Sequence, residues 1–487
     1  MKPLSRRTLF RLIALAAGFA PIALAEVGMR IGGIAEPQTA SLSAIDNDPL
    51  VNLHSLRALF VKNDKGTQME IGAERMNYFC PASFPVEKKP DTLRVFALGG
   101  STTQGQPYRT ETAFPHWLGL RLQAALPDRN IEVVNCGGIS YASYRVAAIL
   151  DEVLRYSPDL IVLYAGHNEF LEARTYEQQR RVPGWLARPL AAVASLRVAR
   201  VIASVLSGRG SSSSKKSVIP GEVDTRLDHP NGMDAYVRDE PWTNAVEQHF
   251  ELTLESMIAR CQEASVPLVL CVPASDLVNT PPFKSQPDPE LPTAERDDVI
   301  RFTKRVESES SELKVRLDAA ERIVKLDPRH ALANYVLGRW AYEAGAGDRA
   351  SAIKRLTIAR DHDVCPLRAT TRIEQAVRSH AGNDDLFLID TGALLDRRNS
   401  RNEAIPDGVA DPGWFVDHVH PTIEGHQEIA TAIYAALIES LFTPADGAEA
   451  TYASHVEQHL QTLGEAYYAR AKQRLDGVNR WSRRLAK

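Results

Sequence analysis

The chain has 487 residues, of which 44% are apolar and 24% charged, and its net charge is -4. This length predicts two or three domains, and the apolar fraction is enough for a large core. The balanced charge offers no basic surface, so nucleic acid is not expected as a partner. The five cysteines form no CxxC or Cys/His cluster, so the sequence indicates no metal site and no cofactor. Cys136 and Cys271 lie in apolar runs and are expected to be buried thiols.

The N-terminus has the pattern of a targeting segment. Arg6 and Arg7 precede an apolar stretch from Leu9 to Ala25, which ends in the cleavage-like run Ala-Leu-Ala. The uncharged part is shorter than the roughly 20 residues that a spanning helix needs. Residues 1–30 are therefore predicted to be a secretory signal peptide, with an uncleaved membrane anchor as the alternative. Residues 5–10 also resemble a twin-arginine export signal. In either case the mature chain is expected to be exported and to act in the periplasm or elsewhere outside the cytoplasm.

Apolar runs that alternate with helical patterns follow. We expect strands at 93–98, 131–135, 160–164, 266–272 and 386–389, and helices at 112–125 and 143–156. Such alternation predicts a mostly parallel sheet, in which ligands bind beyond the carboxyl ends of the strands. Ser101, Gly138 and Asn168 each follow the end of a predicted strand.

Two segments interrupt this α/β pattern. Residues 207–216 form a Gly/Ser/Lys loop, and residues 292–372 have a helical pattern with the spacing of one tetratricopeptide repeat. The helical segment is interpreted as an insertion packed on the core, and the alternative is a surface that binds a protein partner. The predicted organisation is a targeting segment at 1–30, an α/β domain at 44–291 and 373–446, the insertion at 292–372 and a helical tail at 447–487.

The run Gly99 to Thr103 (GGSTT) places a serine between a strand and a probable helix. Ser101 is a candidate nucleophile there, although a tight turn, a helix cap or a phosphate loop has the same pattern. A Walker loop is excluded because it needs Gly-Lys-Ser/Thr. The N–H groups of Ser101 and Gly138 and the side-chain amide of Asn168 could together form an oxyanion hole. Taken alone, Gly138 or Asn168 would be read as turn residues.

The run Asp417 to Pro421 (DHVHP) supplies a base. Asp417 and His420 are three residues apart, on a turn before a helix that Pro421 is expected to open and that runs to about Leu441. His420 would then take the serine proton while Asp417 orients its other ring nitrogen. His418 is interpreted as structural. His167, Glu169 and His426 are expected near the site, and a metal held by His167, His418 and His420 would lack any known spacing motif.

Taken in order, these blocks resemble the SGNH, or GDSL-type, hydrolases: a Gly-Asp-Ser-like turn, a glycine, Gly-x-Asn-Asp and Asp-x-x-His. The resemblance implies a flavodoxin-like three-layer α/β/α sandwich, with Ser101 as nucleophile, His420 as base and Asp417 as its partner. It also implies that Gly138 and Asn168 donate to the oxyanion. Gly100 and Glu169 stand where the family has aspartate, and counting from Asn135 places the family's glycine at Ser140 rather than Gly138. The apolar N-terminus and the helical insertion also resemble an exported or membrane-anchored bacterial subgroup with tetratricopeptide-like helices.

The expected activity is hydrolysis of an O-acyl or O-acetyl ester on a glycan or lipid, through an acyl-enzyme on Ser101. The spacing differs from that of an α/β-hydrolase, whose elbow needs a glycine at position 103. Two alternatives stay open: acyl transfer to a glycan hydroxyl by the same triad, and a catalytically idle scaffold that binds partners through residues 292–372. Arg368 is interpreted as a surface arginine, the alternative being that it projects towards the pocket.

Overall fold

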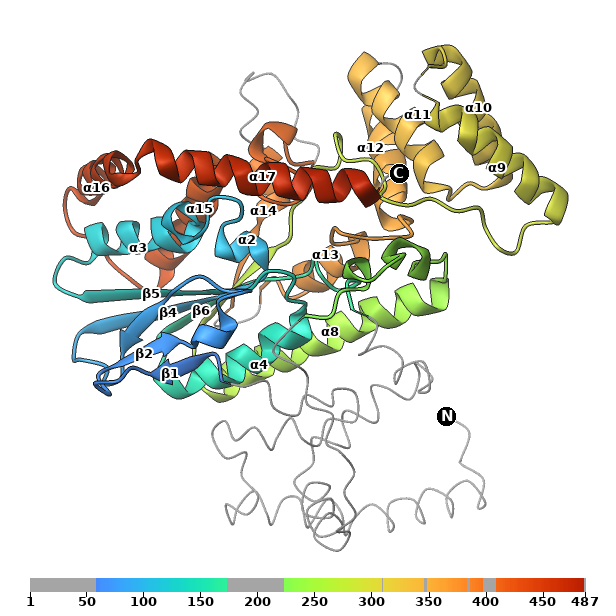
Figure 1. Cartoon of the computed structure of the whole chain (residues 1–487). Helices are drawn as coiled ribbons and strands as arrows, with labels where there is room; N and C mark the ends of the chain where they lie inside the picture. Colours follow the sequence, from blue (N-terminus) through green and yellow to red (C-terminus); the bar gives the residue numbers. More distant parts are fainter. Residues whose placement is uncertain are drawn as a thin grey trace, which may run out of the picture. The chain divides into compact units, whose positions relative to one another are not determined.

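A five-stranded parallel sheet forms the centre of the molecule (Figure 1). The computed structural model describes residues 58–172, 223–308, 310–345, 348–382, 386–396 and 409–485. The strands are β4 (Thr92–Gly99), β5 (Asn130–Gly137), β6 (Leu160–Tyr164), β7 (Leu268–Val272) and β8 (Leu386–Asp390). Their order is β5-β4-β6-β7-β8, and every neighbouring pair is parallel. All five predicted strands are confirmed.

The strands are apolar because both faces of the sheet are covered, as is usual in parallel sheets. Along β4, Phe96 and Leu98 enter the core on one face, and Val95 and Ala97 enter the core on the other. The predicted buried thiols Cys136 and Cys271 are found on β5 and β7, each with almost no exposed surface.

Helices cover both faces of the sheet and make the fold a three-layer α/β/α sandwich (Figure 1). One layer contains α4 (Ser143–Val153), α8 (Glu240–Glu263) and α13 (Thr371–Arg378); the other contains α3 (Phe114–Ala125) and α15 (Ile423–Ser440). The predicted tail consists of α16 (Ala448–Thr462) and α17 (Glu465–Leu485). Helix α16 packs on α3, and Tyr467 of α17 shares a 2.7 Å hydroxyl contact with Thr112. Numbered along the chain, the strand order is 2-1-3-4-5, which reverses between β4 and β6 and places the expected ligand site there.

A small antiparallel sheet, absent from the sequence predictions, precedes the sandwich. It contains β1 (Phe60–Lys62), β2 (Gln68–Ile71) and β3 (Ser83–Pro85). Each strand has too few residues for a clear alternating pattern. The sheet is anchored by aromatic side chains, because Phe84 contacts both Phe60 and Phe96 edge to face, with ring centroids 5.0 and 5.2 Å apart.

The predicted insertion is helical. It consists of α9 (Thr293–Glu307), α10 (Leu313–Leu326), α11 (Ala331–Ala344) and α12 (Arg349–Asp361). Helices α9 to α11 have a separate small core that includes Val299, Phe302 and Ile323. The likeness to a tetratricopeptide repeat stays a prediction, and the expected loop at 207–216 and targeting segment lie outside the described residues.

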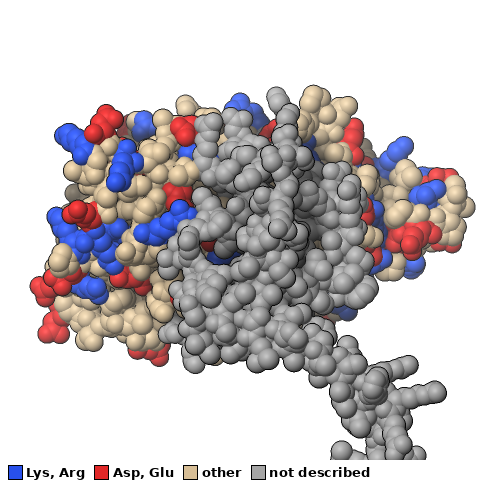
Figure 2. Space-filling view, turned by 90° about the horizontal axis from the view of Figure 1, so that it is seen from below, with Lys and Arg blue, Asp and Glu red and all other residues tan. Residues whose placement is uncertain are grey.

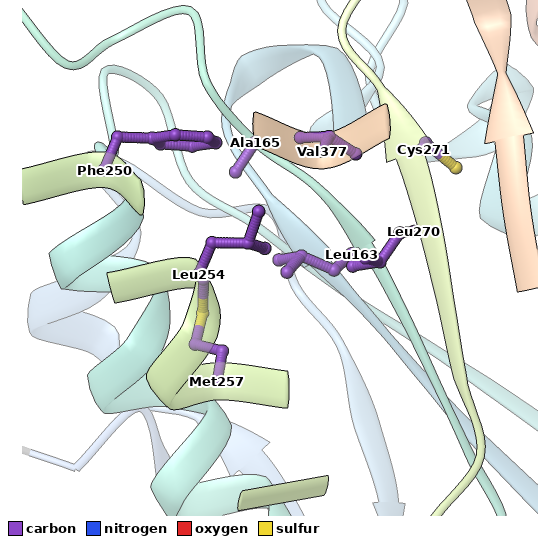
Figure 3. A pocket seen from close by; sticks show the side chains of 8 residues that line it. All are labelled: Leu163, Ala165, Phe250, Leu254, Met257, Leu270, Cys271 and Val377. Atoms are coloured by element: carbon purple, nitrogen blue, oxygen red, sulfur yellow. The ribbon is translucent and has the colours of Figure 1, made fainter. Parts of the chain in front are cut away.

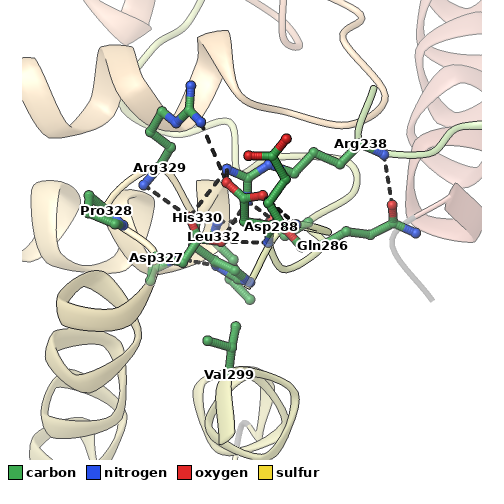
Figure 4. A network of polar contacts seen from close by, with 12 residues as sticks. Arg238, Gln286, Asp288, Val299, Asp327, Pro328, Arg329, His330 and Leu332 are labelled. Atoms are coloured by element: carbon green, nitrogen blue, oxygen red, sulfur yellow. Dashed lines mark hydrogen bonds and ion pairs between the residues drawn. The ribbon is translucent and has the colours of Figure 1, made fainter. Parts of the chain in front are cut away.

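A polar network ties this insertion to the start of α8 and to the segment between β7 and α9 (Figure 4). Arg238 forms ion pairs with Asp327, at 2.6 Å, and with Asp288, at 3.3 Å. The backbone N–H of Asp288 also donates to Asp327, and Arg329 pairs with Glu240 at 2.6 Å. Because Arg238 and Asp327 are buried, each would be costly without the other.

An apolar pocket lies between β6, β7 and helices α8 and α13 (Figure 3). It is lined by Leu163, Ala165, Phe250, Leu254, Met257, Leu270, Cys271 and Val377. None of these side chains offers an acid, a base or a charge, so this pocket is a packing gap within the core.

The described part of the surface in Figure 2 carries interspersed basic and acidic side chains. Among the described residues, no helix combines the length and the apolar character needed to cross a membrane.

Candidate active site

Ser101 lies at the carboxyl end of β4. Strand β4 ends at Gly99, Gly100 is extended, and Ser101 opens the short helix α2 (Ser101–Gln104). A Cβ atom on Gly99 would lie 2.1 Å from both Thr103 Oγ1 and the Tyr164 carbonyl oxygen. Only glycine fits this turn, which holds the half-buried serine at the point where the strand order reverses.

His420 and Asp417 lie in the loop before α15. The loop is closed by a bridge between Phe415 and Pro421 and by a hydrogen bond from the Val416 N–H to the His420 carbonyl. Helix α15 begins at Ile423, with the Thr422 side chain capping it, so the prediction that Pro421 opens the helix was wrong by two residues.

The three predicted triad side chains form one chain of hydrogen bonds. His420 Nε2 lies 2.7 Å from Ser101 Oγ, and His420 Nδ1 lies 2.6 Å from Asp417 Oδ2. The other carboxylate oxygen of Asp417 accepts from the backbone N–H groups of Val419 and His420, both at 2.9 Å. Residues more than 300 positions apart in the sequence thus meet in one site.

The environment of Asp417 determines which atoms of the Ser101–His420–Asp417 hydrogen-bond chain carry protons. Burial alone would raise the pKa of Asp417, but His420, His418 and the hydrogen bonds hold it well below the usual range for aspartate. Asp417 is therefore a carboxylate and can only accept, so the proton of His420 lies on Nδ1. His420 Nε2 is then free to accept the Ser101 proton.

Gly138, the predicted second oxyanion donor, is not available for that role. Its N–H donates to the Gly99 carbonyl at 3.0 Å, which is a sheet-like contact between the ends of two strands. Ser140 lies two residues further on, with a left-handed φ of 61°. Its N–H has no hydrogen-bond partner among the described residues. Counting from Asn135 in the sequence was the signal that pointed to this position.

Asn168 lies where the prediction placed it, beside the Ser101 turn. It follows β6, and its Nδ2 donates to the Tyr141 carbonyl at 3.1 Å, which leaves its second amide hydrogen unused. A Cβ atom on Gly100 would lie 2.7 Å from Asn168 Nδ2, so this amide and the serine turn are in direct contact. The first N–H of α2, that of Ser101, has no acceptor within the helix.

The other polar residues predicted near the site form hydrogen bonds that hold the surrounding loops. Glu169 is buried and accepts from both the N–H and the hydroxyl of Ser143, and burial raises its pKa to about 7. His167 accepts from the Ala369 N–H, and burial lowers its pKa to about 3. His426 accepts from the Phe114 N–H at 3.3 Å. These contacts fix the loops that carry the site, and none of the three residues touches Ser101.

Two further predictions concern His418 and Arg368. His418 is buried against the Phe283 ring, at a centroid distance of 5.3 Å, with Nδ1 3.7 Å from Asp417. This position agrees with a structural role. Arg368 has only 2% of its surface exposed, so its interpretation as a surface residue was wrong.

A parallel α/β sandwich that brings a serine at a strand end together with a histidine and an aspartate from a distant loop has the arrangement of a serine hydrolase. Residues 97–334 match the model of the GDSL-like lipase/acylhydrolase family. This match, over just under half of the chain, identifies the matched region as that of a GDSL-type serine hydrolase that acts on esters.

Solved structures resemble the chain at low identity. A lipolytic protein of the G-D-S-L family from Desulfitobacterium hafniense is 13% identical, with 71% of this chain and 99% of that chain covered and a TM-score of 0.28. The acetyl xylan esterase AlAXEase is 13% identical, with coverages of 71% and 100% and a TM-score of 0.31. An acetylxylan esterase from Geobacillus stearothermophilus is 14% identical, with coverages of 72% and 95% and a TM-score of 0.28. No curated protein matches.

Proposed function

We propose that the protein is an esterase that removes an O-acyl or O-acetyl group by way of an acyl-enzyme on Ser101. The observation that carries this proposal is the hydrogen-bonded chain from Ser101 Oγ through His420 to the Asp417 carboxylate. A serine hydroxyl is a weak nucleophile until a base accepts its proton. The acceptor nitrogen of His420 is 2.7 Å from that hydroxyl.

In the first half of the proposed reaction, Ser101 Oγ bonds to the ester carbonyl carbon while its proton moves to His420 Nε2. The carbonyl oxygen becomes an oxyanion, for which the N–H groups of Ser101 and Ser140 and the amide of Asn168 are the candidate donors. The tetrahedral intermediate collapses, the ester C–O bond breaks, and the proton on His420 passes to the departing alcohol oxygen. The acyl group remains on Ser101.

In the second half, water replaces the alcohol. His420 takes a proton from the water as the water oxygen bonds to the acyl carbon. The second tetrahedral intermediate collapses, the bond from the acyl carbon to Ser101 Oγ breaks, and the proton on His420 passes to Oγ while the carboxylic acid leaves. If a sugar hydroxyl took the place of this water, the same residues would transfer the acyl group. Analysis of products with and without a glycan acceptor separates the two reactions: free acid indicates hydrolysis and an acylated glycan indicates transfer.

The test is Ser101→Ala with p-nitrophenyl acetate as substrate. We expect a loss of at least about 10³-fold in kcat, because removal of a triad nucleophile leaves only the oxyanion donors and binding. Ser379→Ala, which changes an exposed serine directly after α13, is the matched control and should retain wild-type turnover. Unchanged turnover by Ser101→Ala would refute the assignment of Ser101 as the nucleophile. A fluorophosphonate probe that fails to label Ser101 would favour the idle scaffold instead.

We also propose that the chain acts outside the cytoplasm, on the basis of the sequence pattern at 1–30. The mass of the N-terminal peptide of the mature protein tests this proposal. A protein partner at the insertion is proposed too, and its support is the exposure of large apolar side chains on α9 to α11, among them Ile300, Leu313 and Trp340. Pull-down with and without Trp340→Gln tests this partner.

A further inference from the structure

Arg368 is a buried cation that lacks a carboxylate partner. It lies in the segment 362–370, which leads from the last helix of the insertion, α12, to α13. Only 2% of its surface is exposed, and its Nη1 donates to the backbone carbonyls of Asp276 and Thr280, at 3.0 and 3.2 Å. Among the described residues, no carboxylate lies within ion-pair distance of Arg368. Burial lowers its pKa to about 10, so it still carries its charge at neutral pH.

The two acids nearest to this charge are engaged elsewhere. The Asp276 carboxylate accepts from the N–H groups of Val278 and Asn279. The Asp363 carboxylate accepts from the N–H groups of three residues, Phe283, Lys284 and Cys365. Both acids attract Arg368 from a distance without pairing with it.

Two other fully buried arginines, Arg94 and Arg145, are paired with carboxylates. Arg145 meets Glu172 at 2.7 Å through two nitrogens, and Arg94 meets Glu132 at 2.7 Å. Arg75 lacks a carboxylate, but its Nε and Nη1 are sealed from solvent. The Nε and Nη2 of Arg368 have no acceptor among the described residues, yet they are not among the sealed atoms. They therefore keep a small contact with solvent, which the Arg75 atoms lack.

The surroundings of Arg368 border the candidate active site on two sides. The N–H of the next residue, Ala369, donates at 3.2 Å to His167, which directly precedes Asn168. The N–H of Asp276, whose carbonyl holds Arg368, donates at 3.0 Å to the carbonyl of His418, which directly follows Asp417. Burial lowers the pKa of His418, and the charge of Arg368 adds to this effect; the His418 ring lies 6.1 Å from the His420 ring. The segment that carries Arg368 and the 276–280 loop that holds its guanidinium thus each contact one of the two loops that supply the site.

We propose that Arg368 is a specificity-determining residue that binds a carboxylate of the substrate, and that the natural substrate is accordingly an ester carrying a negative charge. The inference rests on the proposed esterase function and names its substrate class. A guanidinium matches a carboxylate with two parallel hydrogen bonds, and desolvation of the pair strengthens them. The free Nε and Nη2 edge of Arg368 is the part of the group that makes such a pair.

The rival explanation is that Arg368 only ties the 276–280 loop to the insertion. Such a role would need the Nη1 contacts alone. With such a role alone, the enzyme would hydrolyse charged and neutral substrates equally well. The ratio of kcat/KM between charged and neutral substrates therefore separates the two explanations.

The experiment compares two pairs of esters on the wild-type protein. One pair is mono-p-nitrophenyl adipate and its methyl ester, which differ by a carboxylate on the acyl side. The other is 4-acetoxybenzoate and its methyl ester, which differ on the alcohol side. We expect kcat/KM for the charged member of one pair to exceed that for its neutral partner by about 10- to 100-fold, the range for a hydrogen-bonded charge pair.

Variants then assign the preference to Arg368. In Arg368→Gln the ratio of charged to neutral kcat/KM should fall by about 10- to 100-fold. Arg368→Lys should keep part of the ratio, because it retains the charge without the fork. Arg301→Gln, which removes an exposed arginine of α9 in the same insertion, should leave the ratio unchanged.

The proposal is overturned if the wild-type protein shows no preference for the charged ester in either pair. It is also overturned if folded Arg368→Gln loses kcat/KM equally on charged and neutral esters. If that variant does not fold, the wild-type ratios and Arg368→Lys still decide. Labelling of Ser101 and hydrolysis of the neutral methyl esters test the esterase function separately. An enzyme active on both methyl esters without any preference would contradict only the role of Arg368.

Discussion

Replacement of Asp417 by asparagine changes one contact of the site and leaves the others in place. Asp417 accepts three hydrogen bonds, two of which come from backbone N–H groups to Oδ1. The amide oxygen of the substituted side chain can accept both of these, so the loop should keep its conformation. The third contact, Oδ2 to His420 Nδ1 at 2.6 Å, would pair an amide N–H with the ring instead of a carboxylate.

This exchange reverses the tautomer of His420. An amide N–H needs an acceptor, so Nδ1 would lose its proton and Nε2 would carry it. Nε2 could then no longer accept the proton of Ser101 Oγ, which lies 2.7 Å away. We expect kcat to fall by about 10⁴-fold, or about 5 kcal/mol of transition-state stabilisation.

The assay is steady-state hydrolysis of p-nitrophenyl acetate, together with the rate of fluorophosphonate labelling and a thermal melt. Asp411→Asn is the matched control, because Asp411 lies in the same loop and caps the Gly413 N–H without contacting the triad. A kcat for Asp417→Asn within tenfold of wild type, at an unchanged melting temperature, would refute the tautomer argument. An equal loss in Asp411→Asn would assign the effect to the loop.

Three further predictions follow from the same structure. Asn168→Ala removes an oxyanion donor and should lower kcat for p-nitrophenyl acetate by about 10²- to 10³-fold with little change in KM; a loss below tenfold would contradict that role. Gly99→Ala places a Cβ atom 2.1 Å from Thr103 Oγ1 and the Tyr164 carbonyl, and it should lower the free energy of unfolding by at least about 3 kcal/mol. Urea titration measures this loss, and an unchanged unfolding midpoint would disprove the clash. Burial lowers the pKa of His426 to about 3. Below about pH 6.5 the unfolded chain therefore binds a proton at His426 that the folded chain does not bind, and the free energy of unfolding falls as the pH falls. Between pH 7.5 and 5.5, His426→Leu should therefore lose about 1.4 kcal/mol less than wild type, and an equal loss would show that His426 titrates alike in both states.

The sequence predicted the sandwich well because its parallel strands are buried on both faces. Such strands consist of continuous apolar runs, and Leu160 to Tyr164 has the same bounds in the structure. Helix α8, with 24 residues, was not predicted, because polar residues interrupt its apolar face. The strands β1 to β3 were not predicted because their stability depends on contacts with Phe96, far away in the chain.

The candidate site also has a part that the sequence predicted and a part that it did not. The arrangement of Ser101, Asp417 and His420 could be predicted because short local motifs and strand ends determine it. The engagement of the Gly138 N–H could not be predicted, since a backbone N–H is available only if no carbonyl accepts it, and the carbonyl that accepts it belongs to Gly99 on another strand. The alternative at Ser140 came only from counting from Asn135. The burial of Arg368 also escaped prediction, because it depends on how the segment 362–370 folds back against the 276–280 loop.

The insertion leaves the sheet after β7 and returns to it before β8, so it interrupts the chain on the side where the strands present Ser101 and Asn168. The nucleophile and the base are encoded outside it, whereas Arg368 belongs to its returning end. The proposed roles in chemistry and in substrate choice therefore belong to different stretches of the sequence. If Arg368 selects the substrate as proposed, exchange of residues 292–372 between relatives would alter which ester is accepted, provided that the Ala369 contact with His167 is kept.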